Sequence, residues 1–132
     1  MPNFAVSSTQ FFNSMDDQVE LNQFLKQLTS EPTTIEFTDT MAVIDALYDF
    51  TPSKFTNGDT VNEAGTNNGS CKIFAFGQDQ GFTVEETLAC FGAFYRSDVL
   101  ENPQGTDHAN IRNFMITGWK GVEFSSQPLI KK

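Results

Sequence analysis

Helical spacing of apolar residues, together with capping signals, divides most of this chain into five predicted helices. The first follows Ser14 and has an apolar stripe at Met15, Val19, Phe24, Leu25 and Leu28. The others begin at Thr38 or Asp39, at Cys71 behind a Ser70 cap, at the capping box Thr83–Glu86, and at Asp107 behind a Thr106 cap. Gly81 and Gly118 end the third and the fifth helix, and Ile111, Phe114 and Met115 are expected to face inward from the fifth. The pattern predicts a mainly α fold, one compact domain of about five helices spanning residues 1–132.

A long stretch between the second and third helices has no helical or strand periodicity. Thr51 to Gly69 is 19 residues long and contains two turn signals, Asn57-Gly58 and Asn68-Gly69. Loops of this length are usually functional or disordered. Because Phe55 and the flanking helices would hold this one down, we expect a long ordered loop.

The remaining segments are predicted to be peripheral or extended. Residues 1–13 are expected to be irregular, with Phe4, Phe11 and Phe12 packed against the body, and residues 125–132 to form a tail. Thr33–Phe37 and Trp119–Phe124 are expected to be extended and to form a minor two-stranded β pairing.

Composition excludes several classes of partner. The chain has 17 acidic against 8 scattered basic residues, a net charge of −9, which argues against nucleic acid and anionic membranes. No apolar stretch approaches the ~18 residues of a spanning helix, so we expect no membrane insertion. Residues 1–14 lack a secretory signal, and Cys71 and Cys90 are too few for a disulfide scaffold. We therefore expect a cytoplasmic protein, a monomer or weak oligomer.

The cysteines and the single histidine do not form a recognisable metal motif. Cys71, Cys90 and His108 lack the close spacing of zinc ligands, so we expect neither a metal nor a cofactor. The alternative for Cys71 is nucleophilic chemistry, because a helix start lowers the pKa of a thiol. His108 would then be its base, with Asp107, Asn110 or Asn113 orienting the imidazole.

The thiol hypothesis has a competing structural explanation. Gly69-Ser70-Cys71 at a helix start is similar to the nucleophile turn of papain-like proteases, but only 37 residues separate Cys71 from His108. That fold needs about 130–150 residues between the two. Helical proteins also place inert, buried cysteines at tightly packed helix starts, and we favour that interpretation.

A ligand site at the two helix starts is a second hypothesis. Free N–H groups at 70–73 and 107–109 point outward from helix starts and can receive an anion. The donors and walls that it would use are Asn67, Asn68, Gly69, Ser70, Lys72, Thr106 and Arg112, with Tyr48, Phe50 and Phe55 as apolar walls. Asp107 already neutralises one helix start, and turn chemistry alone explains many of these residues.

A third hypothesis is a protein-interaction module. Fourteen Phe are many for a core of this size, and exposed aromatic residues mark partner surfaces. Phe11, Phe12 and Phe124 lie outside the helical stripes and are the candidates. The acidic surface would select a basic partner.

Short segments in a fixed order resemble the HopJ type III effector family. The resemblance covers residues of about 35 to 124. The matching segments are Tyr48–Pro52, Phe55 with Asn57-Gly58, Asn62 with Gly65, Asn68–Lys72, Phe74–Phe76, Glu86–Leu88, Phe91-Gly92, Phe94–Arg96, Gly105–His108, Asn110–Phe114 and Gly118-Trp119. The resemblance implies an uncharacterised activity, and its name implies delivery into a host cell by type III secretion as the alternative to a cytoplasmic location.

Together these patterns predict a protein that binds a small ligand or a protein partner. The expected site is the loop end Asn67–Lys72 lying beside Asp107, His108 and Arg112. The alternative function is a thiol hydrolase in which Cys71 attacks and His108 accepts the proton.

Overall fold

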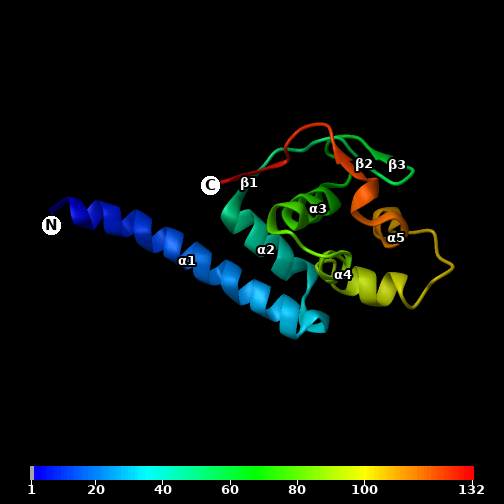
Figure 1. Cartoon of the computed structure of the whole chain (residues 1–132), viewed down its shortest axis with the longest axis horizontal. Coiled ribbons are helices and arrows are strands. Elements are labelled where there is room, and N and C mark those ends of the chain that lie inside the picture. The colour runs from blue at the N-terminus through cyan, green and yellow to red at the C-terminus, as the bar shows by residue number, and fades with distance from the viewer. Residues whose placement is uncertain (1) are drawn as a thin grey trace.

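The structure is a computed structural model that describes the backbone of residues 2–132 and the side chains of residues 15–132. It is mainly helical with a few short antiparallel strands (Figure 1). The helices are α1 (Pro2–Ser30), α2 (Phe37–Leu47), α3 (Asn68–Gln80), α4 (Val84–Ala89), a π-helix η2 (Phe94–Val99) and α5 (Ala109–Thr117), with 3-10 turns η1 (Pro32–Thr34) and η3 (Gly118–Gly121).

The strands form two small antiparallel sheets. Strand β1 (Tyr48–Phe50) pairs with β5 (Leu129–Lys131), so that Asp49 lies opposite Ile130. In the other sheet β2 (Phe55–Asn57) lies between β3 (Thr60–Asn62) and β4 (Val122–Phe124). This sheet contacts α5, so that a β-hairpin lies beside this helix (Figure 1).

Helix α3 lies at the centre of the core. Its buried residues lie on every side of the helix: Cys71, Ile73, Phe74, Ala75, Phe76 and Gly77. The Phe74 ring contacts Phe91 and Phe114, with ring centroids 5.7 Å and 4.9 Å away, and Trp119 at 6.4 Å. Such aromatic pairs contribute about 0.5–1.5 kcal/mol each beyond their buried area. Seven of the eleven Phe whose side chains are described are buried in this core, and five of these belong to α3 or contact its Phe74 ring.

Several predictions from local signals are confirmed. Thr83 and Glu86 form the reciprocal capping box that opens α4, and Gly81 ends α3 in the left-handed conformation. Asn57-Gly58 makes a turn, in which Gly58 has φ +59°. Gly118 follows the last residue of α5.

The predicted long loop is wrong, because residues 55–62 form a hairpin. Its strands are three residues long, and β2 also pairs with β4, which lies more than 60 positions away in the chain. Asn68-Gly69 is no turn either. It forms the first turn of α3, whose N-cap is Asn67, and the predicted Ser70 cap is a residue within the helix.

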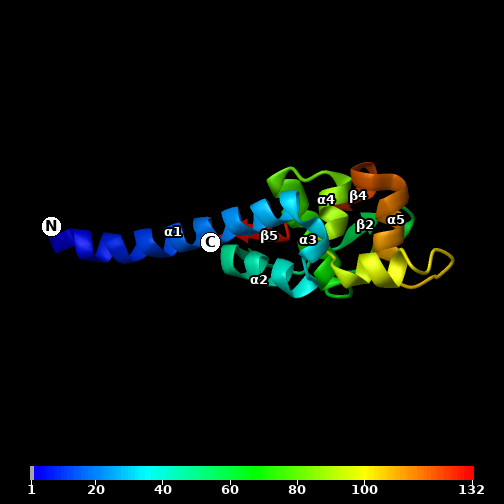
Figure 2. The ribbon, with the colours of Figure 1, turned by 90° about the horizontal axis from the view of Figure 1, so that it is seen from below.

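The predicted ends of the chain are also wrong. Residues 2–13 belong to α1, so Ser14 is no cap, and Figures 1 and 2 show the N-terminal end of α1 lying away from the other elements. The predicted packing of Phe4, Phe11 and Phe12 falls outside the described side chains. Residues 129–131 form β5 instead of a tail, and β4 pairs with β2 instead of residues 33–37, which contain part of η1.

Helix boundaries differ at three further places. Helix α2 begins at Phe37, and the fourth predicted helix breaks at Gly92, where φ is +62°, before continuing as η2. Helix α5 begins at Ala109 with His108 as its N-cap, and Met115 is exposed instead of facing inward.

Candidate functional site

A cavity of about 470 Å³ lies between the first turns of α3 and α5. Aromatic side chains from α2 and from the segment after α4 form its apolar part, and polar groups from the two helix starts converge on it. Its lining residues are Phe37, Thr60, Thr66, Asn67, Asn68, Gly69, Ser70, Phe91, Phe94, His108, Ala109, Asn110 and Ile111.

The α3 wall is a helix N-terminus. Its first intrahelical contact is from Cys71 N–H to Asn67 O, at 3.0 Å, so the amides of residues 68–70 precede the helical hydrogen bonds. The Phe37 ring covers this turn at Gly69, where a Cβ would lie 2.8 Å from Phe37 Cζ. Glycine at 69 therefore lets the aromatic wall approach the backbone of the helix start.

Buried asparagines connect both helix starts to the hairpin. Asn62 Oδ1 accepts from Asn67 Nδ2 at 2.6 Å and from Asn110 Nδ2 at 2.9 Å. Asn110 Oδ1 accepts from Asn62 Nδ2 and from Asn57 Nδ2, both at 3.1 Å. Asn57, Asn62 and Asn110 are all buried. Because each amide is fixed by its partners, the two walls of the cavity are tied to one support.

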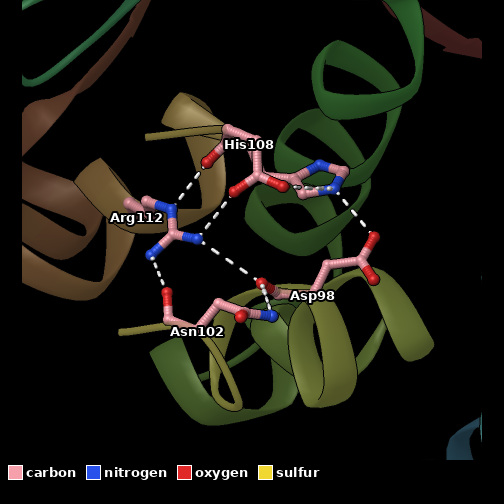
Figure 3. Close-up of polar contacts among 5 residues, drawn as sticks. Asp98, Asn102, His108 and Arg112 are labelled. Carbon is pink, nitrogen blue, oxygen red and sulfur yellow. Dashed lines mark hydrogen bonds and ion pairs between the residues drawn. The ribbon is translucent and has the colours of Figure 1, made fainter. Parts of the chain in front are cut away.

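His108 forms the corner of the α5 wall. It has φ +53° and ψ +49°, the left-handed region that a non-glycine residue seldom occupies. Its ring lies beside Phe94, with centroids 5.3 Å apart, and its Nε2 lies 3.0 Å from Asp98 Oδ2 and 3.9 Å from Asp107 Oδ2. Figure 3 shows the imidazole joined to Asp98 of η2.

Arg112 fixes the loop that leads to His108. Its guanidinium donates to Asp107 O at 2.6 Å, to Asn102 O at 2.9 Å and to Asp107 Oδ1 at 2.7 Å (Figure 3). The hydrogen bond from Arg112 holds the pKa of the Asp107 carboxyl below its usual value. The left-handed backbone at His108 is thus held by Arg112, which binds Asp107 and Asn102 before it and donates its own backbone N–H to His108 O.

The chain matches a family model and is similar to a solved structure. The family model of the HopJ type III effector protein matches residues 21–129. The chain belongs to this HopJ family. The chain is also similar to a crystal structure described as that of the unknown function protein VPA0580, with 60% sequence identity and a TM-score of 0.84. The similarity covers 85% of this chain and 93% of that chain. No curated protein matches the chain.

Cys71 of this HopJ chain lies in the core, away from the cavity lining. Its side chain is 1% exposed, and Sγ lies 3.8 Å from Ser53 O. Burial raises the pKa of the Cys71 thiol, because a thiolate loses its hydration there. His108 lines the cavity and its Nε2 is paired with Asp98, whereas Cys71 Sγ contacts Ser53 O in the core, so the two predicted partners do not form a hydrogen-bonded pair.

Other predicted site residues also lie outside the cavity lining, among them Asp107 and the predicted apolar walls Phe50 and Phe55. Lys72 Nζ lies 2.9 Å from Asp45 Oδ1 and 5.0 Å from the centre of the Phe50 ring. The Tyr48 hydroxyl bonds to Asp79 and receives a hydrogen bond from Gln80, and burial raises its pKa to about 12. Arg112 binds the loop before His108 and does not face the cavity. Thr106 is exposed in the same loop.

Asp98 and the aromatic wall were missed by the sequence reasoning. Asp98 lies on η2, whose π-helical register brings its carboxylate to His108. The helical spacing of Phe91 and Phe94 predicts core residues, and Phe94 is 40% exposed. An acidic residue ten positions before a histidine carries no recognisable signal.

Three observations concern the predictions about a partner surface, a metal site and membrane insertion. Phe124, a candidate partner residue, is half-buried against Phe55, with ring centroids 5.6 Å apart. Among the described residues, no three His, Cys, Asp or Glu side chains are grouped as metal ligands would be. In the described part of the chain, no helix has both the length and the apolar composition needed to cross a membrane.

Proposed function

We propose that this HopJ protein binds a small ligand in the cavity between α3 and α5. The supporting observation is the combination of an aromatic wall with convergent polar groups from two helix starts. Small-molecule sites typically have volumes of about 300–1,000 Å³ and place polar groups beside apolar walls, and the lining of this cavity is more polar than is usual for them. A volume of about 470 Å³ accommodates a ligand of one or two rings.

The backbone of His108 also supports a binding role. A non-glycine residue in the left-handed region costs on the order of 1 kcal/mol or more, and such residues are concentrated at ligand and active sites. Arg112 and Asp98 hold this conformation, which keeps the imidazole against the Phe94 ring and on the cavity.

A second, larger cavity is a weaker candidate. It measures about 560 Å³ and lies between the end of α1 and η2, with Leu28, Pro32, Ala89, Tyr95 and Leu100 among its lining residues. Two of its polar side chains are engaged elsewhere: Arg96 binds Ile35 O and Glu36, and Glu86 accepts from the Thr83 N–H. Specific recognition needs polar groups that are free to meet a ligand.

A fragment screen by NMR tests the binding proposal. Aromatic fragments bearing one polar group are added to ¹⁵N-labelled protein, and the amides of residues 67–70 and 108–111 are expected to shift. Ala109→Phe places a ring in the cavity and is expected to abolish these shifts. Ala42→Phe, at an exposed position on α2 outside the lining, is the matched control and should bind as the native protein does. Shifts confined to other regions would contradict the proposal.

The family description supports a separate proposal about location. We infer that the chain is a substrate of type III secretion, for which the cytoplasm of the producing cell is the alternative location. A reporter fusion is expected to leave bacteria with an intact secretion apparatus and to stay inside an otherwise identical strain lacking its ATPase. Equal release by both strains, or by neither, would contradict secretion by this route.

A further inference from the structure

The two ring nitrogens of His108 have different surroundings. Nε2 faces the carboxylates of Asp98 and Asp107, at 3.0 Å and 3.9 Å. An ionised carboxylate only accepts hydrogen bonds, so Nε2 must carry a proton to bond with Asp98. In the neutral imidazole the other nitrogen, Nδ1, is therefore left as an acceptor.

The Nδ1 atom is available to a ligand. No hydrogen bond to it occurs among the described residues, whereas Figure 3 shows the ring joined through its other nitrogen to Asp98, with Nδ1 turned away. The ring lines the cavity and lies against Phe94 at a tilt of 38°. A flat ligand in the cavity would thus meet an aromatic wall and a hydrogen-bond acceptor together.

The charges around His108 disfavour an anionic ligand. Asp98 and Asp107 both lie beside the ring, and the guanidinium of Arg112, the nearby cation, is engaged by Asp107 and by backbone carbonyls. A phosphate or carboxylate bound at the ring would lie near two acidic side chains, and the guanidinium beside them is already paired. A neutral hydrogen-bond donor avoids this repulsion.

We propose that the cavity selects neutral aromatic ligands that carry an O–H or N–H donor, such as phenols or N–H heterocycles, and that His108 Nδ1 accepts this hydrogen bond. Asp98 is the positioning residue, because it holds the imidazole in the tautomer that presents Nδ1. The inference rests on the proposed binding function and adds the chemical class of the ligand. It replaces the anion that the sequence suggested for the helix starts.

Phenol and anisole test the donor requirement, because they share a ring and differ in the O–H. At about pH 8, where histidine is ordinarily neutral, phenol is expected to bind three- to tenfold more tightly than anisole, as one hydrogen bond would give. His108→Phe keeps a ring and removes the acceptor, so its phenol-to-anisole ratio should fall to about one. Equal affinities in the native protein would overturn the inference while leaving the cavity as a binding site. If neither probe shifts the cavity amides, the proposed function itself fails.

The tautomer of His108 gives a measurement that needs no ligand and no folding control. In ¹⁵N spectra of histidine-labelled native protein, Nε2 is expected to be protonated and Nδ1 bare. The Nδ1–H tautomer as the main species would overturn the inference. Asp98→Asn weakens the hold on Nε2–H and should lower the share of that tautomer. An unchanged tautomer in this variant would overturn the role of Asp98.

Discussion

Gly92 lies where the chain passes close to the backbone at the start of α2. It has φ +62° and lies between α4 and η2. A Cβ there would lie 2.6 Å from Phe37 N and 3.1 Å from Glu36 C. Both neighbours are backbone atoms at the start of α2, so no side-chain rotation can relieve the contact.

The expected cost of Gly92→Ala has two parts. A left-handed alanine costs about 1–2 kcal/mol. Forcing extra volume against fixed neighbours typically adds about 1–3 kcal/mol. The sum is a loss of about 2–5 kcal/mol in the free energy of unfolding. Gly81→Ala is the matched control, because Gly81 has φ +73° but a Cβ added there would meet no atom within 4 Å, so only the first part applies.

Urea unfolding followed by far-UV circular dichroism measures both variants. We expect Gly92→Ala to lose more stability than Gly81→Ala by about 1–3 kcal/mol, with similar m-values. Gly92→Ala should also shift NMR signals of Phe37, because the backbone of that residue would have to move away from the added methyl group. Equal losses in the two variants would refute the reasoning, since they would show that the close approach to α2 costs nothing.

Three further predictions follow from buried groups. Burial raises the pKa of the Cys71 thiol and raises that of Cys90 to about 12. Native protein at pH 8 should therefore react with iodoacetamide at least about a hundredfold more slowly than urea-unfolded protein. Rapid labelling of Cys71 would instead support the thiol hydrolase hypothesis. Asn62→Ala removes the acceptor of Asn110 Nδ2 and should cost about 1–3 kcal/mol in urea unfolding. An unchanged midpoint would contradict the network. The pKa of Tyr48 is raised from 10.0 to about 12, so its contribution to folding stability is present below pH 10 and is lost as pH rises toward 12. Tyr48→Phe should therefore flatten the decline in the free energy of unfolding between pH 9 and 12. An identical decline in this variant would contradict the prediction.

Local chemistry explains which parts of the fold the sequence predicts. The capping box at Thr83, the left-handed glycine at 81 and the Asn57-Gly58 turn act within a few residues, so their spacing is visible in the sequence. The strands are different, because each has only three residues and a partner that is distant in sequence. Strand β5 forms by pairing with β1, which lies about 80 positions earlier in the chain. In neither segment does the alternation of apolar and polar residues continue long enough to predict a strand.

Some residues of the predicted site line the cavity and others do not, and helical geometry explains the difference along α3. The resemblance and the turn residues drew attention to Asn67–Ser70 and to His108, and the structure brings these residues together on one cavity. Lys72 follows directly along α3 but projects toward Asp45, since neighbouring helical positions point in different directions. Cys71 projects inward for the same reason. Periodicity alone could separate lining from core residues only if the start of α3 were known to within one residue.

The hairpin gives the two walls of the cavity a common support, which links folding to binding. Asn62 of β3 holds both Asn67, at the start of α3, and Asn110, in the first turn of α5. These two helix starts are more than 40 positions apart, and the hairpin lies between α2 and α3 in the chain. A change in the hairpin must therefore move both walls, because each depends on the same amide oxygen. The segment that looked like a long loop in the sequence is, in this account, what sets the distance between the polar groups that a ligand would meet.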